Sequence, residues 1–172
     1  MEMKLRQLAS AFLFRGDQVL LMNKPASKWQ GRSEPFYAAI GGHMEPDELN
    51  DPLAACFREI EEETGLRREE IHQMRLRYIL MRQKEAEIRV QYVYTGEVMR
   101  TELTTSEEGQ PKWQNMNEVP PLLTSVFLQA VWQHLMTEGC LHKERVYTGT
   151  MAIDHTGRPL VHWNELIDPL VF

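Results

Sequence analysis

The sequence predicts an α/β fold with a mixed β-sheet, and three segments carry that prediction. Residues 8–14 and 19–23 are apolar runs joined by a short polar turn, a pattern typical of an antiparallel hairpin. Residues 52–65 carry apolar side chains at the helical period, whereas residues 88–98 alternate between apolar and polar as a strand does. Strands and helices therefore mix, and the hairpin excludes a purely parallel sheet.

The remaining elements follow from the same patterns. Further strands are expected at residues 36–40, 77–83 and 112–115, and an amphipathic helix at 122–138, closed by Gly139. The tail over 145–163 reads as an added hairpin that turns at 155–157. The predicted sheet thus has a compact core and an extra pair of strands at its C-terminal end.

Length and composition indicate one domain. A chain of 172 residues with 42% hydrophobic and 26% charged residues can bury a full core, and no linker or repeat divides it. We expect a single domain over 1–172, with its core at about 5–140 and the hairpin extension at 141–172. No run approaches the roughly 18 apolar residues of a membrane span, so we expect no membrane partner and a cytoplasmic location.

Charge and cysteine content narrow the partners. The formal net charge is −6, and no basic stripe of the kind that binds DNA or long RNA is evident, so no nucleic-acid polymer is expected. A small anionic substrate stays compatible with the sequence, because bound metal ions reverse the local field of acidic side chains. Two cysteines do not form a disulfide framework, and the six histidines show no zinc spacing.

The helix predicted at 52–65 has two faces of different chemistry. One face is apolar at i, i+3, i+4 and i+7: Leu53, Cys56, Phe57 and Ile60. Glu59, Glu62 and Glu63 share another side, and like charges at these spacings cost roughly 0.2–0.5 kcal/mol per pair in a bare helix. Such a cluster favours a compensating cation, and hard oxygen ligands suit magnesium or manganese. For an isolated helix, a solvated acidic face is the alternative interpretation.

The segment from Gly42 to Leu66 resembles the signature of the Nudix hydrolases. That signature runs Gly, five free positions, Glu, seven free positions, Arg-Glu, an aliphatic residue, one free position, Glu-Glu, one free position, Gly and an aliphatic residue. The matching residues of this chain are Gly42, Glu48, Arg58, Glu59, Ile60, Glu62, Glu63, Gly65 and Leu66. We call the segment from Gly42 to Leu66 the box.

The box departs from the family pattern at one place. Nine residues, not seven, separate Glu48 from Arg58. Asp51 is a favourable N-cap and Pro52 a favourable first helical residue, so we place the two-residue insertion in the loop before the helix. The helical phase of the glutamates is then retained, whereas Glu48 is free to shift from its usual place.

The resemblance implies a Nudix-type α/β/α sandwich and hydrolysis of a phosphoanhydride in a nucleoside diphosphate linked to another group, X. Mg²⁺, or Mn²⁺ in its place, would be the cofactor, and a small phosphorylated nucleotide the partner. Two alternatives stay open: a non-catalytic nucleotide sensor, and an isoprenoid diphosphate isomerase, which would require a reactive cysteine such as Cys56. The extra hairpin could form the surface of a homodimer.

The resemblance also suggests roles for individual residues. Glu59, Glu62 and Glu63 would be the metal ligands, with Arg58 orienting these carboxylates. Glu45 is a further candidate ligand or a solvated turn residue. The base that activates water would be one of the helix glutamates or a loop glutamate. In the loop at 106–110 we favour Glu108 over Glu107, and a merely charged loop is the alternative interpretation.

Substrate contacts are expected around the glycine turn. Gly41 and Gly42 would approach the diphosphate, and a carbonyl of this pair could add a metal ligand. Lys24 could reach a phosphate, although an ordinary surface lysine explains it as well. Aromatic side chains could stack on a nucleobase or simply pack in the core: Trp29, Tyr37 and Trp113.

Overall fold

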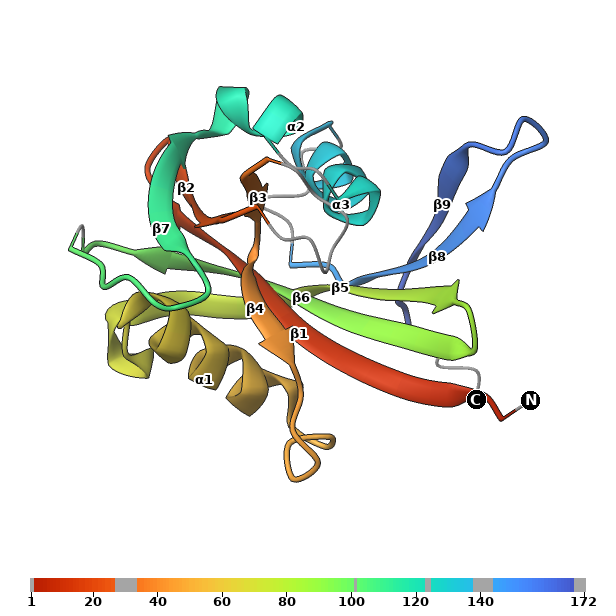
Figure 1. Ribbon diagram of the computed structural model, residues 1–172, viewed down its shortest axis with the longest axis horizontal. Coiled ribbons are helices and arrows are strands. Elements are labelled where there is room, and N and C mark those ends of the chain that lie inside the picture. The colour runs from red at the N-terminus through yellow and green to blue at the C-terminus, as the bar shows by residue number, and fades with distance from the viewer. Residues whose placement is uncertain (1, 27–33, 101, 123–124, 138–143, 169–172) are drawn as a thin grey trace.

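The computed structural model describes residues 2–26, 34–100, 102–122, 125–137 and 144–168. One mixed sheet runs through the molecule, with helix α1 (Pro52–Thr64) on one face and α3 (Val126–Thr137) on the other (Figure 1). The expected α/β/α sandwich is confirmed. The strands are β1 (Lys4–Arg15), β2 (Gln18–Lys24), β3 (Phe36–Ala38), β4 (Ile40–His43), β5 (Ile71–Lys84), β6 (Glu87–Val98), β7 (Gln110–Asn115), β8 (Tyr147–Ile153) and β9 (Pro159–Glu165).

The strand order is β3-β2-β1-β6-β5-β8-β9, with β4 paired to β1 and β7 paired to β2. β1 pairs in parallel with β6 and antiparallel with β2 and β4, so the sheet is mixed as expected. Short helical turns complete the described chain: η2 (Arg68–Glu70), η3 (Met116–Glu118) and α2 (Val119–Leu122). No helix among the described residues is long and apolar enough to cross a membrane.

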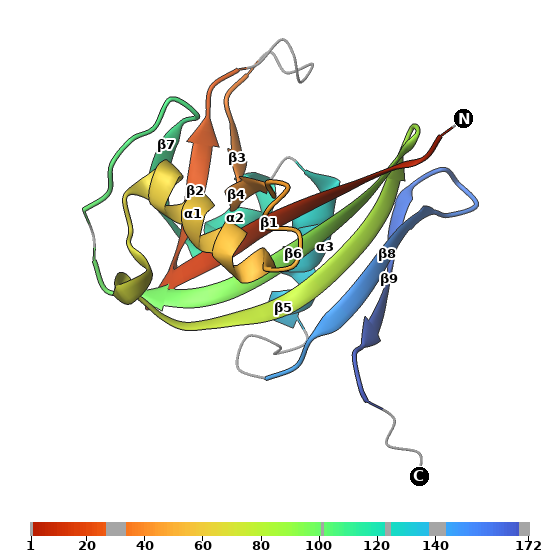
Figure 2. The same ribbon diagram turned by 90° about the horizontal axis from the view of Figure 1, so that it is seen from below.

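The alternation of β1 sends its side chains to two separate cores. Phe12 and Phe14 face α3, where Trp132 packs against both rings. Leu13 and its odd-numbered neighbours face α1, where Cys56 and Ile60 are fully buried. Figure 2 shows α1 lying across the strands of its face. Each helix therefore packs on the sheet through an apolar stripe. The side of α1 that carries Glu59, Glu62 and Glu63 is not part of this stripe.

Helix α1 begins and ends where the sequence predicts. The side chain of Asp51 accepts a hydrogen bond from the backbone N–H of Ala54 at 3.0 Å, and Pro52 occupies the first turn. Gly65 closes the helix in the left-handed region, at φ 73°, and its N–H donates to the carbonyl of Glu61. The insertion before the helix thus leaves the phase of the box glutamates intact.

Several predicted strands are longer in the structure, and three predicted elements differ in more than length. The strand expected at 36–40 is divided at Ala39, because β3 pairs with β2 whereas β4 pairs with β1. β5 begins six residues before the expected 77, since two register shifts interrupt its alternation. The prediction of one helix over 122–138 was wrong at its start: Leu122 ends α2, and α3 begins at Val126. Gly139 lies outside the described residues.

The predicted C-terminal hairpin is present as β8 and β9, which extend the sheet beyond β5. A group of rings joins it to the body of the protein. Trp163 of β9 lies 5.1 Å from the Tyr78 ring of β5 and 4.7 Å from the His134 ring of α3, measured between centroids. The hairpin is therefore attached through side chains as well as through strand pairing.

Candidate active site

The glycine turn and two glutamates of α1 form the centre of the site. Glu59 and Glu63 lie one helical turn apart and are almost fully buried, 8% and 2% exposed, against strand β4. A Cβ added to Gly42 would lie 2.6 Å from Oε2 of Glu59, so only glycine allows this approach. The backbone N–H of Gly41 donates to Oε2 of Glu63 at 2.7 Å. The helix thus brings its carboxylates directly against the turn.

Arg58 connects the other carboxylates. Its Nε and Nη2 donate to the two oxygens of Glu48 at 2.7 and 2.9 Å, a bidentate pair. Its Nη1 donates to Glu59 and to Glu62, each at 3.0 Å. Nη2 also donates to the carbonyl of His43 at 3.1 Å. One guanidinium therefore links the loop, the helix and the glycine turn.

Lys24 forms a second bridge, from the end of β2. Its Nζ donates to Oε1 of Glu63 at 3.1 Å and to Oε2 of Glu108 at 2.8 Å. The Lys24 side chain is only 18% exposed, whereas that of Glu108 is 62% exposed. Lys24 is therefore not an ordinary surface lysine, because it ties the loop before β7 to the helix.

Burial and ion pairing shift the pKa values of these groups in opposite directions. Burial raises the pKa of Glu63 to about 7, despite the nearby ammonium of Lys24. Burial also raises the pKa of Glu59, although Arg58 opposes the shift. The hydrogen bonds from Arg58 lower the pKa of Glu48, and those from Lys24 lower the pKa of Glu108. Glu59 and Glu63 thus hold protons more strongly than Glu48 and Glu108 do.

Of the other candidate residues, Glu45 lies beside this centre and the described aromatic ones pack in the two cores. Glu45 is exposed in the turn after β4, where its backbone N–H donates to Glu48. Tyr37 lies on β3 and packs against the core on the α3 side. Trp113 on β7 packs against the α1 core and has the Arg15 guanidinium 4.6 Å from its ring centroid. Trp29 lies outside the described residues.

The sequence predicted that Arg58 orients the box carboxylates, but two features of the site were not predicted. The bidentate pair between Arg58 and Glu48 spans the inserted loop, and the place of both residues in the box pattern was the signal for it. The second feature is the bridge formed by Lys24. Its partners Glu63 and Glu108 follow it by 39 and 84 positions in the sequence, and no local pattern reveals pairs so far apart. Both features depend on how α1 packs on the sheet.

The side chains fit a hard divalent cation in their chemistry. Carboxylate oxygens, the donors that Mg²⁺ and Mn²⁺ prefer, come from Glu59, Glu62 and Glu63, and the missing side chain of Gly42 lets the Glu59 carboxylate reach the glycine turn. In the described part of the chain, however, no three such groups are arranged as a ready metal site. Arg58 and Lys24 occupy the carboxylates, so a bound metal would have to compete with these two cations.

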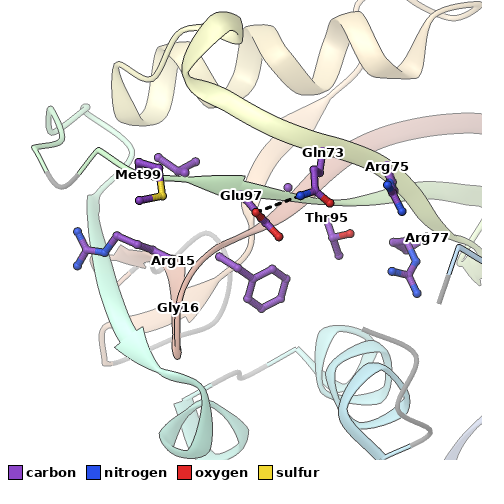
Figure 3. Close-up of a pocket in the computed structure, with 11 residues that line it drawn as sticks. Arg15, Gly16, Gln73, Arg75, Arg77, Thr95, Glu97 and Met99 are labelled. Atoms are coloured by element: carbon purple, nitrogen blue, oxygen red, sulfur yellow. Dashed lines mark hydrogen bonds between the residues drawn. The ribbon is translucent and has the colours of Figure 1, made fainter. Parts of the chain in front are cut away.

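The hollow drawn in Figure 3 lies elsewhere. It has a volume of about 430 Å³ and is lined by the end of β1 and by β5 and β6, including Phe14, Arg77, Thr95 and Glu97. None of the described residues that line it belongs to the box. The candidate site is therefore the helix face at Gly41 and Gly42, where the charged side chains converge.

The fold and this arrangement of a glycine turn against a glutamate-rich helix define a Nudix-type hydrolase. A NUDIX domain model matches residues 4–132, three quarters of the chain, and the chain belongs to the Nudix family. The resemblance drawn from the box is thus confirmed, and so is the prediction of a Nudix pyrophosphohydrolase at the level of the family.

Solved structures agree in fold. The MutT protein from Bacillus halodurans has a TM-score of 0.69 and 23% identity, over 95% of this chain and 99% of that one. A NUDIX hydrolase from Nitrosomonas europaea has a TM-score of 0.69 and 12% identity, over 87% and 80%. An Ap4A hydrolase from C. elegans has a TM-score of 0.61 and 16% identity, over 78% and 98%. No curated protein sequence gave a match.

Proposed function

We propose that this chain hydrolyses a phosphoanhydride bond in a nucleoside diphosphate derivative, with a divalent metal ion bound by the glutamates of α1. The observation that supports this most is the approach of Glu59 to Gly42, which leaves no space for a side chain at that position. Such close packing brings carboxylates to backbone that a phosphate can reach. A small phosphorylated nucleotide is then the partner.

Mg²⁺ or Mn²⁺ would be held by Glu59 and Glu62, with Glu63 beside them and Glu45 as a candidate from the adjacent turn. Bound there, the ion would neutralise phosphate charge and make water a better nucleophile. Glu63 already accepts from Gly41 and from Lys24, so its first task is to fix the glycine turn. Glu62 is exposed, so of the three glutamates it is the one whose carboxylate can turn most freely toward a metal ion.

The cationic side chains position the acidic ones. Arg58 divides its donors between Glu48 on the loop and two helix carboxylates, so it fixes Glu59 and Glu62 relative to the loop. Lys24 holds Glu108 at the edge of the site, where this carboxylate could accept a proton from water. A phosphate entering near Lys24 would compete with Glu63 and Glu108 for its ammonium group.

The structure weighs against the isomerase alternative. Cys56 is fully buried in the core beneath α1, and burial raises the pKa of its thiol well above the usual range. A thiol in this position packs and does not react. The sensor alternative predicts nucleotide binding without turnover, so the two remaining functions differ in a measurable way.

The test is a panel of nucleoside triphosphates, nucleotide sugars and dinucleotides incubated with the protein and Mg²⁺ or Mn²⁺ in oxygen-18 water. Mass spectrometry of the products identifies the substrate and the phosphorus that receives the labelled oxygen. We expect one substrate class to be cleaved only when metal is present, with a single label per bond broken. Tight nucleotide binding without labelled product would favour the sensor.

A further inference from the structure

Three arginines lie side by side across neighbouring strands on the α3 face of the sheet. Arg6 of β1 is the register partner of Arg89 of β6, and Arg89 is the register partner of Arg82 of β5. Residues two apart in a strand share a face, so Arg6 lies on the same side as Phe12. Adjacent strands are about 4.8 Å apart, so the three positions span roughly 10 Å. We call this set the arginine row.

The charge of the arginine row is only partly compensated. Glu87 pairs with Arg89 at 2.7 Å and with Arg6 at 3.2 Å. Arg82 instead lies 5.8 Å from the centroid of the Phe127 ring and has no carboxylate partner among the described residues. Like charges opposite each other across strands are destabilising, and burial together with Arg89 lowers the pKa of Arg82. The row therefore favours an additional anion.

Further cations and an open hollow surround the row. Lys4 and Lys84 are both register partners of Glu87, at the end of the sheet where β1 begins and β5 turns into β6 (Figure 2). A hollow of about 590 Å³ at this end is lined by Lys4, Lys84, Glu87 and Arg89, with the turn between β5 and β6. This concentration of positive charge stands out on a chain whose net charge is −6.

The row is next to the glycine turn. In the pairing of β4 with β1, Gly42 is opposite Ala9 and His43 is opposite Leu8, two residues from Arg6. Nη1 of Arg6 lies 3.2 Å from Nε2 of His43. Gly42 faces Glu59 and the metal ligands proposed above, whereas His43 faces the row. A ligand held at the turn can therefore extend over β4 onto the arginines.

We propose that the arginine row binds a phosphate group at the far end of the substrate, so that X carries negative charge of its own. The inference rests on the proposed function, and it narrows the substrate class to nucleoside diphosphates whose X bears phosphate. Guanidinium groups suit this task because they donate two parallel hydrogen bonds to phosphate oxygens. A neutral sugar as X would leave the row without its anion.

The direct test is calorimetric titration of the full-length protein with inorganic tripolyphosphate, in metal-free buffer of low ionic strength. We expect Arg82→Gln to weaken binding at least tenfold. The matched control is Arg100→Gln, since Arg100 is an exposed arginine paired with Glu70 away from the row; it should bind within twofold of the unmodified protein. Equal binding by Arg82→Gln, or an equal loss in the control, would overturn the proposal.

A second test compares two substrates with the same nucleoside diphosphate part, a nucleoside triphosphate and a nucleoside diphosphate glucose. The kcat/KM for the triphosphate divided by that for the glucose derivative should fall at least tenfold in Arg82→Gln. The same ratio should stay constant in Arg100→Gln. If Arg82→Gln does not fold, as judged by circular dichroism, Arg6→Gln takes its place with a loss of at least threefold in both tests. The titration needs no turnover, so the two proposals can fail separately. If the protein hydrolyses none of the nucleotides, the proposed function is overturned, and tripolyphosphate binding still decides the role of the arginine row.

Discussion

Of the three proposed metal ligands on α1, Glu62 contributes least to the folded structure. Its side chain is 59% exposed, and its hydrogen bond in the described chain is to Arg58. Replacing Glu62 by Gln removes the charge with little change of shape, so turnover should fall at least about a hundredfold, as when metal sites are disturbed, whereas stability changes by no more than about 0.5 kcal/mol. Steady-state kinetics and thermal melts measure both effects, with Glu61→Gln as the exposed neighbouring control. Full activity in Glu62→Gln would remove this side chain from the mechanism.

Gly42 tests the close packing in the centre of the site. In Gly42→Ala the new Cβ would meet the carboxylate of Glu59 at 2.6 Å, so this buried carboxylate must move away from the glycine turn and from Arg58, at a cost of about 1–3 kcal/mol. Urea unfolding should show this loss together with reduced turnover. In the double variant with Glu59→Ala the clash is absent, so the two losses in stability should not add. Additive losses would show that Gly42 and Glu59 do not touch.

Residue patterns predicted that the glutamates of α1 share one side of a helix, but not how deeply each is buried. The spacing of Glu59, Glu62 and Glu63 places them on one side of a helix, yet it does not say that two are buried and one is exposed. That difference depends on the angle at which α1 crosses β4. The bridge from Lys24 could not be predicted because its partners are distant in the sequence.

At the scale of the element, Asp51 fixes the start of α1 and therefore the phase of every box residue. Asp51→Ala removes the acceptor for the N–H of Ala54 and should cost about 1 kcal/mol in the free energy of unfolding. Asp51→Asn retains a capping oxygen and should cost much less. Urea titrations of both variants make the comparison. Equal losses would show that the cap does not stabilise the helix.

Element boundaries were predictable where local chemistry sets them. The ends of α1 follow from Asp51, Pro52 and Gly65, whose caps are local. The break at Ala39 and the early start of β5 were not predictable, because they depend on which neighbouring strand is paired and on two register shifts. Long-range pairing leaves no periodic trace in the sequence.

At the scale of the molecule, the ring group around Trp163 determines how firmly the C-terminal hairpin is held. A Cβ at Gly149 would lie 2.7 Å from the Trp163 ring, so the ring packs directly on β8 as well as on Tyr78 and His134. Trp163→Ala should cost about 1–3 kcal/mol and speed hydrogen exchange in β8 and β9, with little change in α1. His162→Ala, at an exposed position of the same strand, is the control. Unchanged exchange in Trp163→Ala would show that strand pairing alone holds the hairpin.

The stability of the whole molecule should depend on pH through Glu63. Burial raises its folded-state pKa to about 7 from an ordinary value of 4.5, so between these values the folded protein binds a proton that the unfolded chain has released. This contribution is full below about pH 4.5 and is lost as the pH rises through 7. Burial chiefly lowers the pKa of His43 from its ordinary value of 6.5, so His43 makes the folded protein more stable as the pH rises through this range. The contribution of Glu63 is therefore obtained from the difference between the unmodified protein and a Glu63 variant. In metal-free buffer, Glu63→Gln should therefore lose less stability between pH 5 and 7.5 than the unmodified protein does. Urea unfolding of both proteins at several pH values tests this, and parallel stability curves would mean that Glu63 stays ionised beside Lys24 throughout.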